Sequence, residues 1–155
     1  MAKRSIKEIE DAVLAALSPL ADSLGVRQIE SYNGELDLEK IEAAVQQWPA
    51  VLVYYAGSSV EKEGRRRNEH LAFLCFCCDR HESEQSEARR GGLTNPGTYA
   101  LLDGVADLLE GKRQIAADDV FPADRLAQQT EVQGHALSIY SARYSIQTVY
   151  LVPME

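Results

Sequence analysis

Apolar residues recur at helical spacing over the first twenty positions of the chain, which predicts an amphipathic helix. The residues of this stripe are Ile6, Ile9, Val13, Leu17 and Leu20. Ser5 and Glu8 have the spacing of a capping box, in which two side chains satisfy free backbone N–H groups at a helix start. Pro19 lacks an N–H, so the helix either kinks there or restarts with Ser18 as its cap, and Gly25 fits its end.

A weak strand and a short second helix are predicted next. Residues 26–32 favour a strand that ends in the turn pair Asn33-Gly34. Asp37 can cap the helix, and Pro49 ends it because the residue before a proline is pushed away from the helical conformation. The apolar stripe of this helix comprises Leu38, Ile41, Val45 and Trp48.

Two apolar runs predict strands that are buried on both faces of a sheet. Residues 50–56 are rich in Val and Tyr, and residues 70–79 carry apolar side chains at odd and even positions alike. Side chains alternate between the two faces of a strand, so such runs are typical of central strands.

Polar segments follow each of these runs. Residues 57–68 are predicted to form a loop or hairpin tip, and residues 80–94 a second loop. Loops as long as the second one are usually functional or mobile in a compact domain.

The C-terminal part of the chain predicts one more helix and two antiparallel strands. Asn95-Pro96 opens the helix, and Gly111 closes it. Residues 120–132 and 135–152 form the strands, and the second is long enough to need a bend or bulge. The order α-β-α-β-β-α-β-β indicates an α+β fold, with a mostly antiparallel sheet packed by helices on one face, and we expect residues 1–155 to form a single domain.

Composition and charge restrict the function. The chain has 155 residues, of which 45% are hydrophobic and 26% charged, as in ordinary globular proteins. The net charge of −8 argues against nucleic-acid binding as a primary role, because such binders usually carry a basic surface. We find no signal peptide and no apolar run long enough to span a bilayer, and therefore expect synthesis in a cytoplasm and no membrane partner.

The three cysteines, Cys75, Cys77 and Cys78, are the most conspicuous chemical feature. Three clustered cysteines are a poor disulfide framework, which fits a reducing compartment. Their spacing does not match a zinc site, and Cys77 and Cys78 would point to opposite faces of a strand. We therefore expect core residues rather than metal ligands.

No other constellation points to catalysis or to a cofactor. His70, His81 and His135 lack a recognisable partner motif, and Gly57-Ser58-Ser59 is not a nucleophile elbow. The sequence contains no phosphate-binding glycine pattern. Asp118-Asp119 is not followed by a spaced set of oxygen ligands, so a solvated pair is expected. We expect no catalytic residues, no metal and no cofactor.

Two basic clusters stand out against the acidic background. Both fall in predicted loops, and they consist of Arg65, Arg66 and Arg67 and of Arg89 and Arg90. Arginine forks suit carboxylates, and arginine is enriched at protein interfaces, so these residues are candidates for contacts with a neighbouring subunit or an acidic tail component. Solvated loop tips are the alternative.

The order of these elements resembles the Mu-like prophage tail protein family that is encoded just before the contractile sheath gene. The resemblance covers nearly the full chain and rests mainly on packing residues. It is carried by residues 9–14 (IEDAVL), 29–32 (IESY), 48–58 (WPAVLVYYAGS), 99–105 (YALLDGV) and 136–148.

The resemblance implies a structural, non-enzymatic role in the virion tail. Proteins of the tail-terminator or tail-completion type form a ring, often hexameric, on the last ring of the tail tube. The ring stops polymerisation and offers a surface for the head-tail junction. The implied partners are further copies of the chain, the tail tube, and the sheath or head-completion proteins, with synthesis in the bacterial host cytoplasm.

Two other functions compete with this interpretation. The first is a small cytoplasmic enzyme with an unrecognised site. If that site used a cysteine thiolate, the cysteine should be partly exposed. The second is an adaptor that binds partners without forming a ring.

Overall fold

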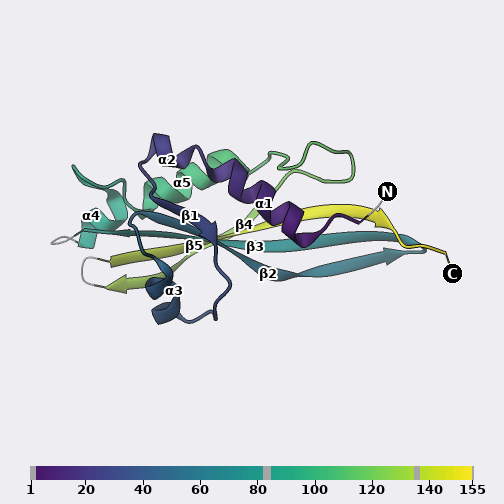
Figure 1. Cartoon of the computed structure of the whole chain (residues 1–155), viewed down its shortest axis with the longest axis horizontal. Coiled ribbons are helices and arrows are strands. Elements are labelled where there is room, and N and C mark those ends of the chain that lie inside the picture. Colours follow the sequence, from purple (N-terminus) through teal and green to yellow (C-terminus); the bar gives the residue numbers. More distant parts are fainter. Residues whose placement is uncertain (1–2, 82–84, 135–136, 155) are drawn as a thin grey trace.

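The computed structural model describes residues 3–81, 85–134 and 137–154 (Figure 1). Its strands run along the long axis of the molecule, and the helices lie against them. In chain order the elements are α1 (Ile6–Leu17), α2 (Leu20–Ser23), β1 (Gln28–Ser31), α3 (Leu38–Ala44), β2 (Ala50–Glu63), β3 (Arg66–Arg80), α4 (Gln85–Arg90), α5 (Thr98–Leu109), β4 (Asp124–Gly134) and β5 (Leu137–Leu151).

The strands form one five-stranded sheet in the order β1-β2-β3-β5-β4. β1 pairs with β2 in parallel, and the other neighbouring pairs are antiparallel. This confirms the predicted α+β class with a mostly antiparallel sheet. The centre of the sheet is the pair β3 and β5, which runs without a register break from Arg66 opposite Leu151 to Arg80 opposite Leu137.

The predicted helix caps form as the sequence indicates. The Ser5 hydroxyl accepts a hydrogen bond from the Glu8 backbone N–H at 3.0 Å, and Asp37 accepts one from Glu39 at 2.9 Å. At Pro19 the chain restarts rather than kinks, because α1 ends at Leu17 and α2 begins at Leu20. The residue at the cap position of α2 is Pro19, so the assignment of Ser18 as the cap is wrong.

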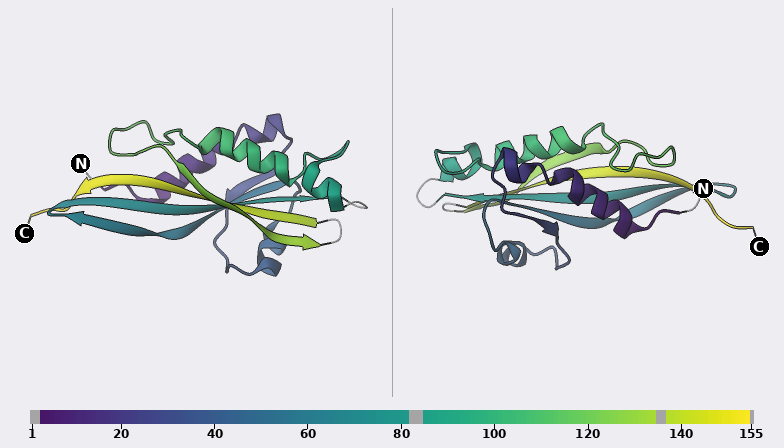
Figure 2. Two further views of the ribbon diagram at one scale, coloured as in Figure 1. Left: turned by 180° about the vertical axis from the view of Figure 1, so that it is seen from behind. Right: turned by 45° about the horizontal axis from the view of Figure 1, so that its top comes forward.

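Helices cover both faces of the sheet, so the prediction that they lie on one face is wrong. In Figure 2, α3 lies on the side of the sheet opposite α1, α2 and α5. The larger core lies under α1, α2 and α5 and includes Phe73 and Tyr144, whereas the smaller one packs Ile41 of α3 against Leu52 and Phe76. The physical reason is that β2 and β3 are apolar on both faces, and each apolar face must be buried against another layer.

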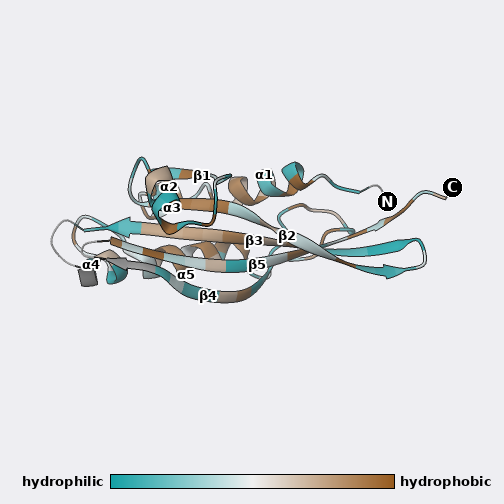
Figure 3. Ribbon diagram, turned by 90° about the horizontal axis from the view of Figure 1, so that it is seen from below, coloured by the Kyte–Doolittle hydropathy of each residue, from teal (hydrophilic) through white to brown (hydrophobic). Residues whose placement is uncertain are grey.

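The predicted polar loop over residues 57–68 is mostly strand. β2 continues to Glu63, and β3 begins at Arg66, so that only Gly64 and Arg65 form the turn. A register shift between Tyr55 and Ser58 marks a bulge in β2. This polar end of the hairpin extends past the helices (Figure 3), and ladder hydrogen bonds pair the strands there although residues 58–63 are exposed and mostly polar.

The predicted loop over residues 80–94 contains the short helix α4. Ala88 is fully buried there, and one buried alanine is too weak a pattern to reveal a helix in the sequence. The bulge expected in the last strand is also absent from the β3–β5 register, since the shifts lie in β2 and β4. α4 is thus an addition to the predicted element order, whereas α2 is the restart at Pro19 that the sequence offered as one alternative.

Candidate functional site

The cysteine cluster lies in the core on both sides of β3. Cys75 and Cys77 belong to the larger core and Cys78 to the smaller one, and each is fully buried. Burial raises the pKa of Cys75 to about 12, and it also raises the pKa values of Cys77 and Cys78 far above the usual range of a thiol. A buried neutral thiol is a poor nucleophile, so these cysteines do not provide the exposed, reactive thiol that a cysteine-dependent enzyme would need.

The histidines lie on different parts of the surface. His70 Nε2 lies 3.5 Å from a carboxylate oxygen of Glu61, and His81 Nε2 lies 2.7 Å from one of Glu87. The candidate His135 lies outside the described residues. Within residues 3–81, 85–134 and 137–154, no group of three or more His, Cys, Asp or Glu side chains is placed to hold a metal ion.

The acidic pair Asp118-Asp119 has a structural explanation. Asp119 accepts a hydrogen bond from Arg4 at 3.1 Å, which lowers the pKa of the Asp119 carboxyl group. Asp118 is fully exposed, 3.9 Å from Arg113. The serine candidate Ser58 is engaged in β2, where its hydroxyl donates to Glu69 at 2.7 Å.

The structure places the two arginine clusters at opposite ends of the long axis. The turn residue Arg65 lies at the hairpin tip, beside Arg66 and Arg67 of β3, far from α4 (Figure 1). Arg65 Nε donates to the backbone oxygen of Val152 at 3.0 Å, and Arg67 Nη1 donates to that of Gly64 at 2.7 Å. The prediction that these arginines lie in a loop holds for Arg65 and is wrong for Arg66 and Arg67.

Arg89 and Arg90 end α4 and are not loop residues either. Arg90 is exposed. Arg89 is half-buried, and its Nε atom is buried with no hydrogen-bond partner in the described part of the chain. Arg90 is therefore the more accessible of the two for contact with a partner.

β4 is an edge strand whose outer side faces away from the sheet. Residues 124–130 are exposed, including Leu126 at 57%. Register shifts at Arg125/Ala127 and Thr130/Val132 leave a short regular stretch between them. An open strand edge of this kind offers unpaired backbone groups to another chain.

A shallow groove of about 420 Å³ runs beside β4. Tyr99 of α5 lines it, is 42% exposed, and packs edge-to-face on Tyr140 with ring centroids 5.8 Å apart. Partly exposed tyrosines beside an open edge are typical of protein interfaces. The sequence predicted no functional residue in this groove. Tyr99 stands beside the apolar stripe of the predicted helix, and nothing in the sequence distinguishes it from a packing residue.

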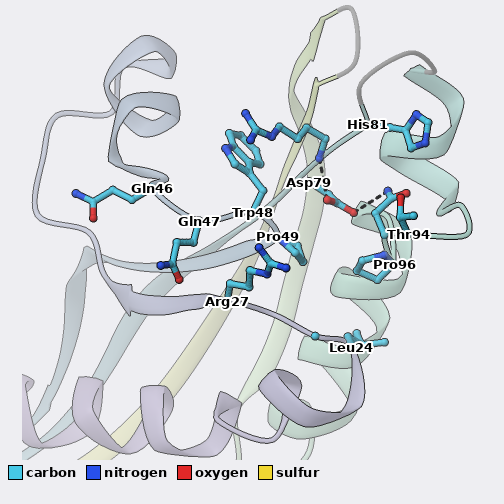
Figure 4. Close-up of a pocket in the computed structure, with 13 residues that line it drawn as sticks. Leu24, Arg27, Gln46, Gln47, Trp48, Pro49, Asp79, His81, Thr94 and Pro96 are labelled. Atoms are coloured by element: carbon cyan, nitrogen blue, oxygen red, sulfur yellow. Dashed lines mark hydrogen bonds between the residues drawn. The ribbon is translucent and has the colours of Figure 1, made fainter.

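A larger cleft, of about 730 Å³, lies at the end of the molecule near α4. Its walls come from the start of β1, the α3–β2 connection, the end of β3 and the α4–α5 connection (Figure 4). The polar and aromatic residues at its surface include Arg27, Gln46, Gln47, Trp48, Arg80 and Thr94.

Trp48 is part of this cleft and not of a helix stripe. α3 ends at Ala44, four residues before Trp48, and the indole is half-buried. The Arg80 guanidinium lies over it, 5.4 Å from the ring centroid. The sequence could not join these residues, because Arg27, Trp48 and Arg80 belong to segments that meet only in the folded sheet.

Asp79 forms the floor of the cleft and fixes its wall. It is 1% exposed and accepts hydrogen bonds from the backbone N–H of Arg80 at 2.8 Å, from Asn95 Nδ2 at 3.0 Å and from the Gly97 N–H at 2.7 Å. Burial raises the pKa of this carboxyl, against the opposing effect of the hydrogen bonds. These bonds tie the α4–α5 connection to the end of β3.

Two glycines allow that connection to fold tightly. Gly91 and Gly97 both have positive φ angles, of 91° and 84°. A Cβ atom on Gly97 would lie within van der Waals overlap of the backbone at Gly91, Arg89 and Arg90. In this wall of the cleft, the backbone at Gly97 therefore packs directly against the backbone at the end of α4.

These features together define a small α+β protein with an open strand edge, an arginine cluster at each end and a cleft. Residues 5–149 match the family described as "Bacteriophage Mu, Gp37". The chain therefore belongs to the Bacteriophage Mu Gp37 family, which confirms the resemblance to a Mu-like phage tail family.

Two further comparisons complete this result. One similar solved structure is described as the "Virion of native gene transfer agent (GTA) particle". It has 15% identity and a TM-score of 0.48, with 90% of this chain and 87% of that chain covered. No curated protein matches the chain.

None of the helices in the described residues is long and apolar enough to cross a membrane.

Proposed function

We propose that the chain is a structural subunit that completes the phage tail, and that copies of it form a ring on the end of the tail tube. Membership of the Mu Gp37 family carries this proposal. The implied ring is hexameric, its partners are the tail tube and the sheath or head-completion proteins, and its final location is the virion tail after synthesis in the host cytoplasm.

The open edge of β4 supports the ring. A ring needs head-to-tail contacts, in which one surface of a subunit meets a different surface of the next. β4 and the groove beside Tyr99 form one such surface on one side of the sheet, and β1 lies at the other side. We place the ring contact at β4, with Leu126 as its exposed apolar residue.

Complementation of a phage that lacks this gene tests the β4 contact. We expect Leu126→Glu to lower the yield of infectious particles at least tenfold, because burying a leucine contributes about 1.5–3 kcal/mol at each contact and a buried unpaired charge is unfavourable. Electron microscopy should then show tails of uncontrolled length without heads, as for the gene deletion.

Leu36→Glu is the matched control, because Leu36 has the same exposed fraction, 57%, and lies outside β4. This variant should restore normal tails. Equal yields of infectious particles from the two variants would show that β4 is not part of the ring interface. Normal tails in the phage that lacks the gene would contradict the proposed role in tail completion.

The arginines remain part of the proposal as contacts with other tail proteins. Arg65, Arg66 and Arg67 lie at one end of the subunit, with Arg89 and Arg90 at the other. Because the two arginine clusters lie at opposite ends, we expect them to contact different tail proteins.

Replacing Arg65, Arg66 and Arg67 together by alanine is expected to leave the subunit folded but to lower head joining, measured as the ratio of complete particles to free tails. The reason is the loss of three guanidinium groups from an accessible tip. A triple lysine variant keeps the charge and should lower the ratio less. Unchanged particle ratios in the alanine variant would refute this role.

A further inference from the structure

The cleft between β1, β3 and the α4–α5 connection is a site to which the family match assigns no role. It is lined by 13 residues and has a volume of about 730 Å³, much larger than one small ion. Pockets of 300–1,000 Å³ are typical of specific ligand sites. Its chemistry can therefore indicate which ligand it accepts.

Positive charge gathers in this cleft although the chain as a whole is acidic. The sequence has 24 Asp and Glu residues against 16 Lys and Arg. Arg27 and Arg80 are exposed, line the same cleft, and make no ion pair within the described residues. Figure 4 shows Arg27 pointing into the space between Pro49 and Gln47.

The geometry of Arg80 suits carboxylate recognition. Its guanidinium lies over the Trp48 ring, which holds the group in place while leaving its N–H donors accessible at the edge. A guanidinium fork binds a carboxylate through two parallel hydrogen bonds. The Asp79 carboxylate is not bound to the Arg80 guanidinium. Its oxygens instead accept hydrogen bonds from the backbone N–H of Arg80, from Asn95 Nδ2 and from the backbone N–H of Gly97.

The amide groups in the cleft suit a peptide backbone. The backbone N–H groups of Gln46 and Gln47 are held by the Gln28 side chain at 2.7 and 3.1 Å, so this wall is fixed in position. The side-chain amides of Gln46 and Gln47 are exposed and have no partner in the part of the chain that the structure describes. Amides of this kind can both donate to and accept from a peptide group.

We propose that this cleft binds an acidic peptide segment of a partner protein, with its carboxylates on Arg27 and Arg80 and its backbone on Gln46 and Gln47, against the Trp48 ring. The proposal concerns binding by the purified chain and does not depend on tail completion. A chain that completes tails can still fail to bind such a peptide.

Trp48 provides a direct measurement because it is the single tryptophan of the chain. The purified full-length chain is titrated at low ionic strength with a hexaglutamate peptide whose ends are blocked, and fluorescence and calorimetry are recorded. We expect saturable binding that weakens as salt is added, and none to hexaglutamine of the same length. Inorganic phosphate and a hexathymidine oligonucleotide are titrated in parallel.

Variants locate the peptide on the cleft. We expect Arg80→Gln and Arg27→Gln each to weaken binding about tenfold by calorimetry, since each removes charge-assisted hydrogen bonds. Arg80→Lys keeps the charge but loses the planar fork and should also bind less well than the native chain. Arg143→Gln is the matched control, because Arg143 is exposed in the middle of β5, opposite Leu74, and lies outside the cleft.

Three results would overturn the proposal. They are no binding of hexaglutamate, equal weakening by Arg143→Gln and Arg80→Gln, or binding of phosphate or oligothymidylate at least as tight as that of hexaglutamate. Thermal unfolding of each variant is measured first. If Arg80→Gln does not fold, Arg27→Gln and Arg80→Lys decide the test.

Discussion

Replacing Gly97 by alanine is expected to lower the free energy of unfolding by about 3 kcal/mol or more. Gly97 has φ 84° and ψ 154°, a region of backbone space that residues with a Cβ atom rarely enter. The added methyl group would also overlap backbone atoms of Arg89, Arg90 and Gly91, which cannot move aside as a flexible side chain can. Backbone strain and steric overlap therefore add at one position.

Urea denaturation of Gly97→Ala and Gly111→Ala separates these two causes. Gly111 also has a positive φ, of 72°, but a Cβ atom there would meet nothing within 4 Å. We expect a smaller loss, of about 1–2 kcal/mol, for Gly111→Ala, which reports a positive-φ backbone cost without steric overlap. Equal losses for the two variants would mean that the tight contact between Gly97 and the Gly91 segment adds nothing to stability.

The second large effect is expected from Asp79→Ala, with a loss of about 3 kcal/mol. The substitution leaves three buried or half-buried donors, on Arg80, Asn95 and Gly97, without their acceptor. An unsatisfied buried donor costs more than the net contribution of one hydrogen bond. Asp118→Ala is the control, because that carboxylate is fully exposed, and it should change the unfolding free energy little.

Asp79 should also make stability depend on pH. Its folded-state pKa is raised, mainly by burial, so between the unfolded and folded pKa values the folded chain binds the proton more tightly. The contribution is fully present below the unfolded pKa and is lost as pH rises through the folded pKa. Relative to Asp79→Asn, which does not titrate, the native chain should therefore gain unfolding free energy when the pH falls from neutral into the acid range. A constant difference across that range would contradict the raised pKa.

The sequence predicted the strands of the sheet more accurately than the placement of the helices on its two faces, and the reason is physical. The apolar runs of β2 and β3 show that both faces are buried, yet such runs do not say which helix covers which face. Ile41 and Val45 of the α3 region have the same type of stripe as Ile9 and Val13 of α1, and only the fold places them on opposite sides. The polar side chains of residues 57–68 led to the wrong prediction of a loop. Backbone hydrogen bonds between strands form there although the side chains are mostly polar.

The cleft could not be predicted from the sequence. Arg27, Trp48 and Arg80 are separated by about twenty to thirty positions, and no spacing rule for a motif connects them. Each has an ordinary interpretation by itself, as a solvated charge or an apolar stripe residue. The cysteines are the opposite case, since alternation along a single strand was enough to place them on two faces of a core.

The uninterrupted pairing of β3 with β5 sets the length of the molecule. Fifteen residues of strand at roughly 3.3 Å each give a ribbon of about 50 Å. The tip at Gly64-Arg65 and the cleft near Arg80 lie at the two ends of this ribbon, so they cannot approach each other without breaking the ladder. If partners bind at both ends, as proposed above, the length of these two strands sets the distance between them.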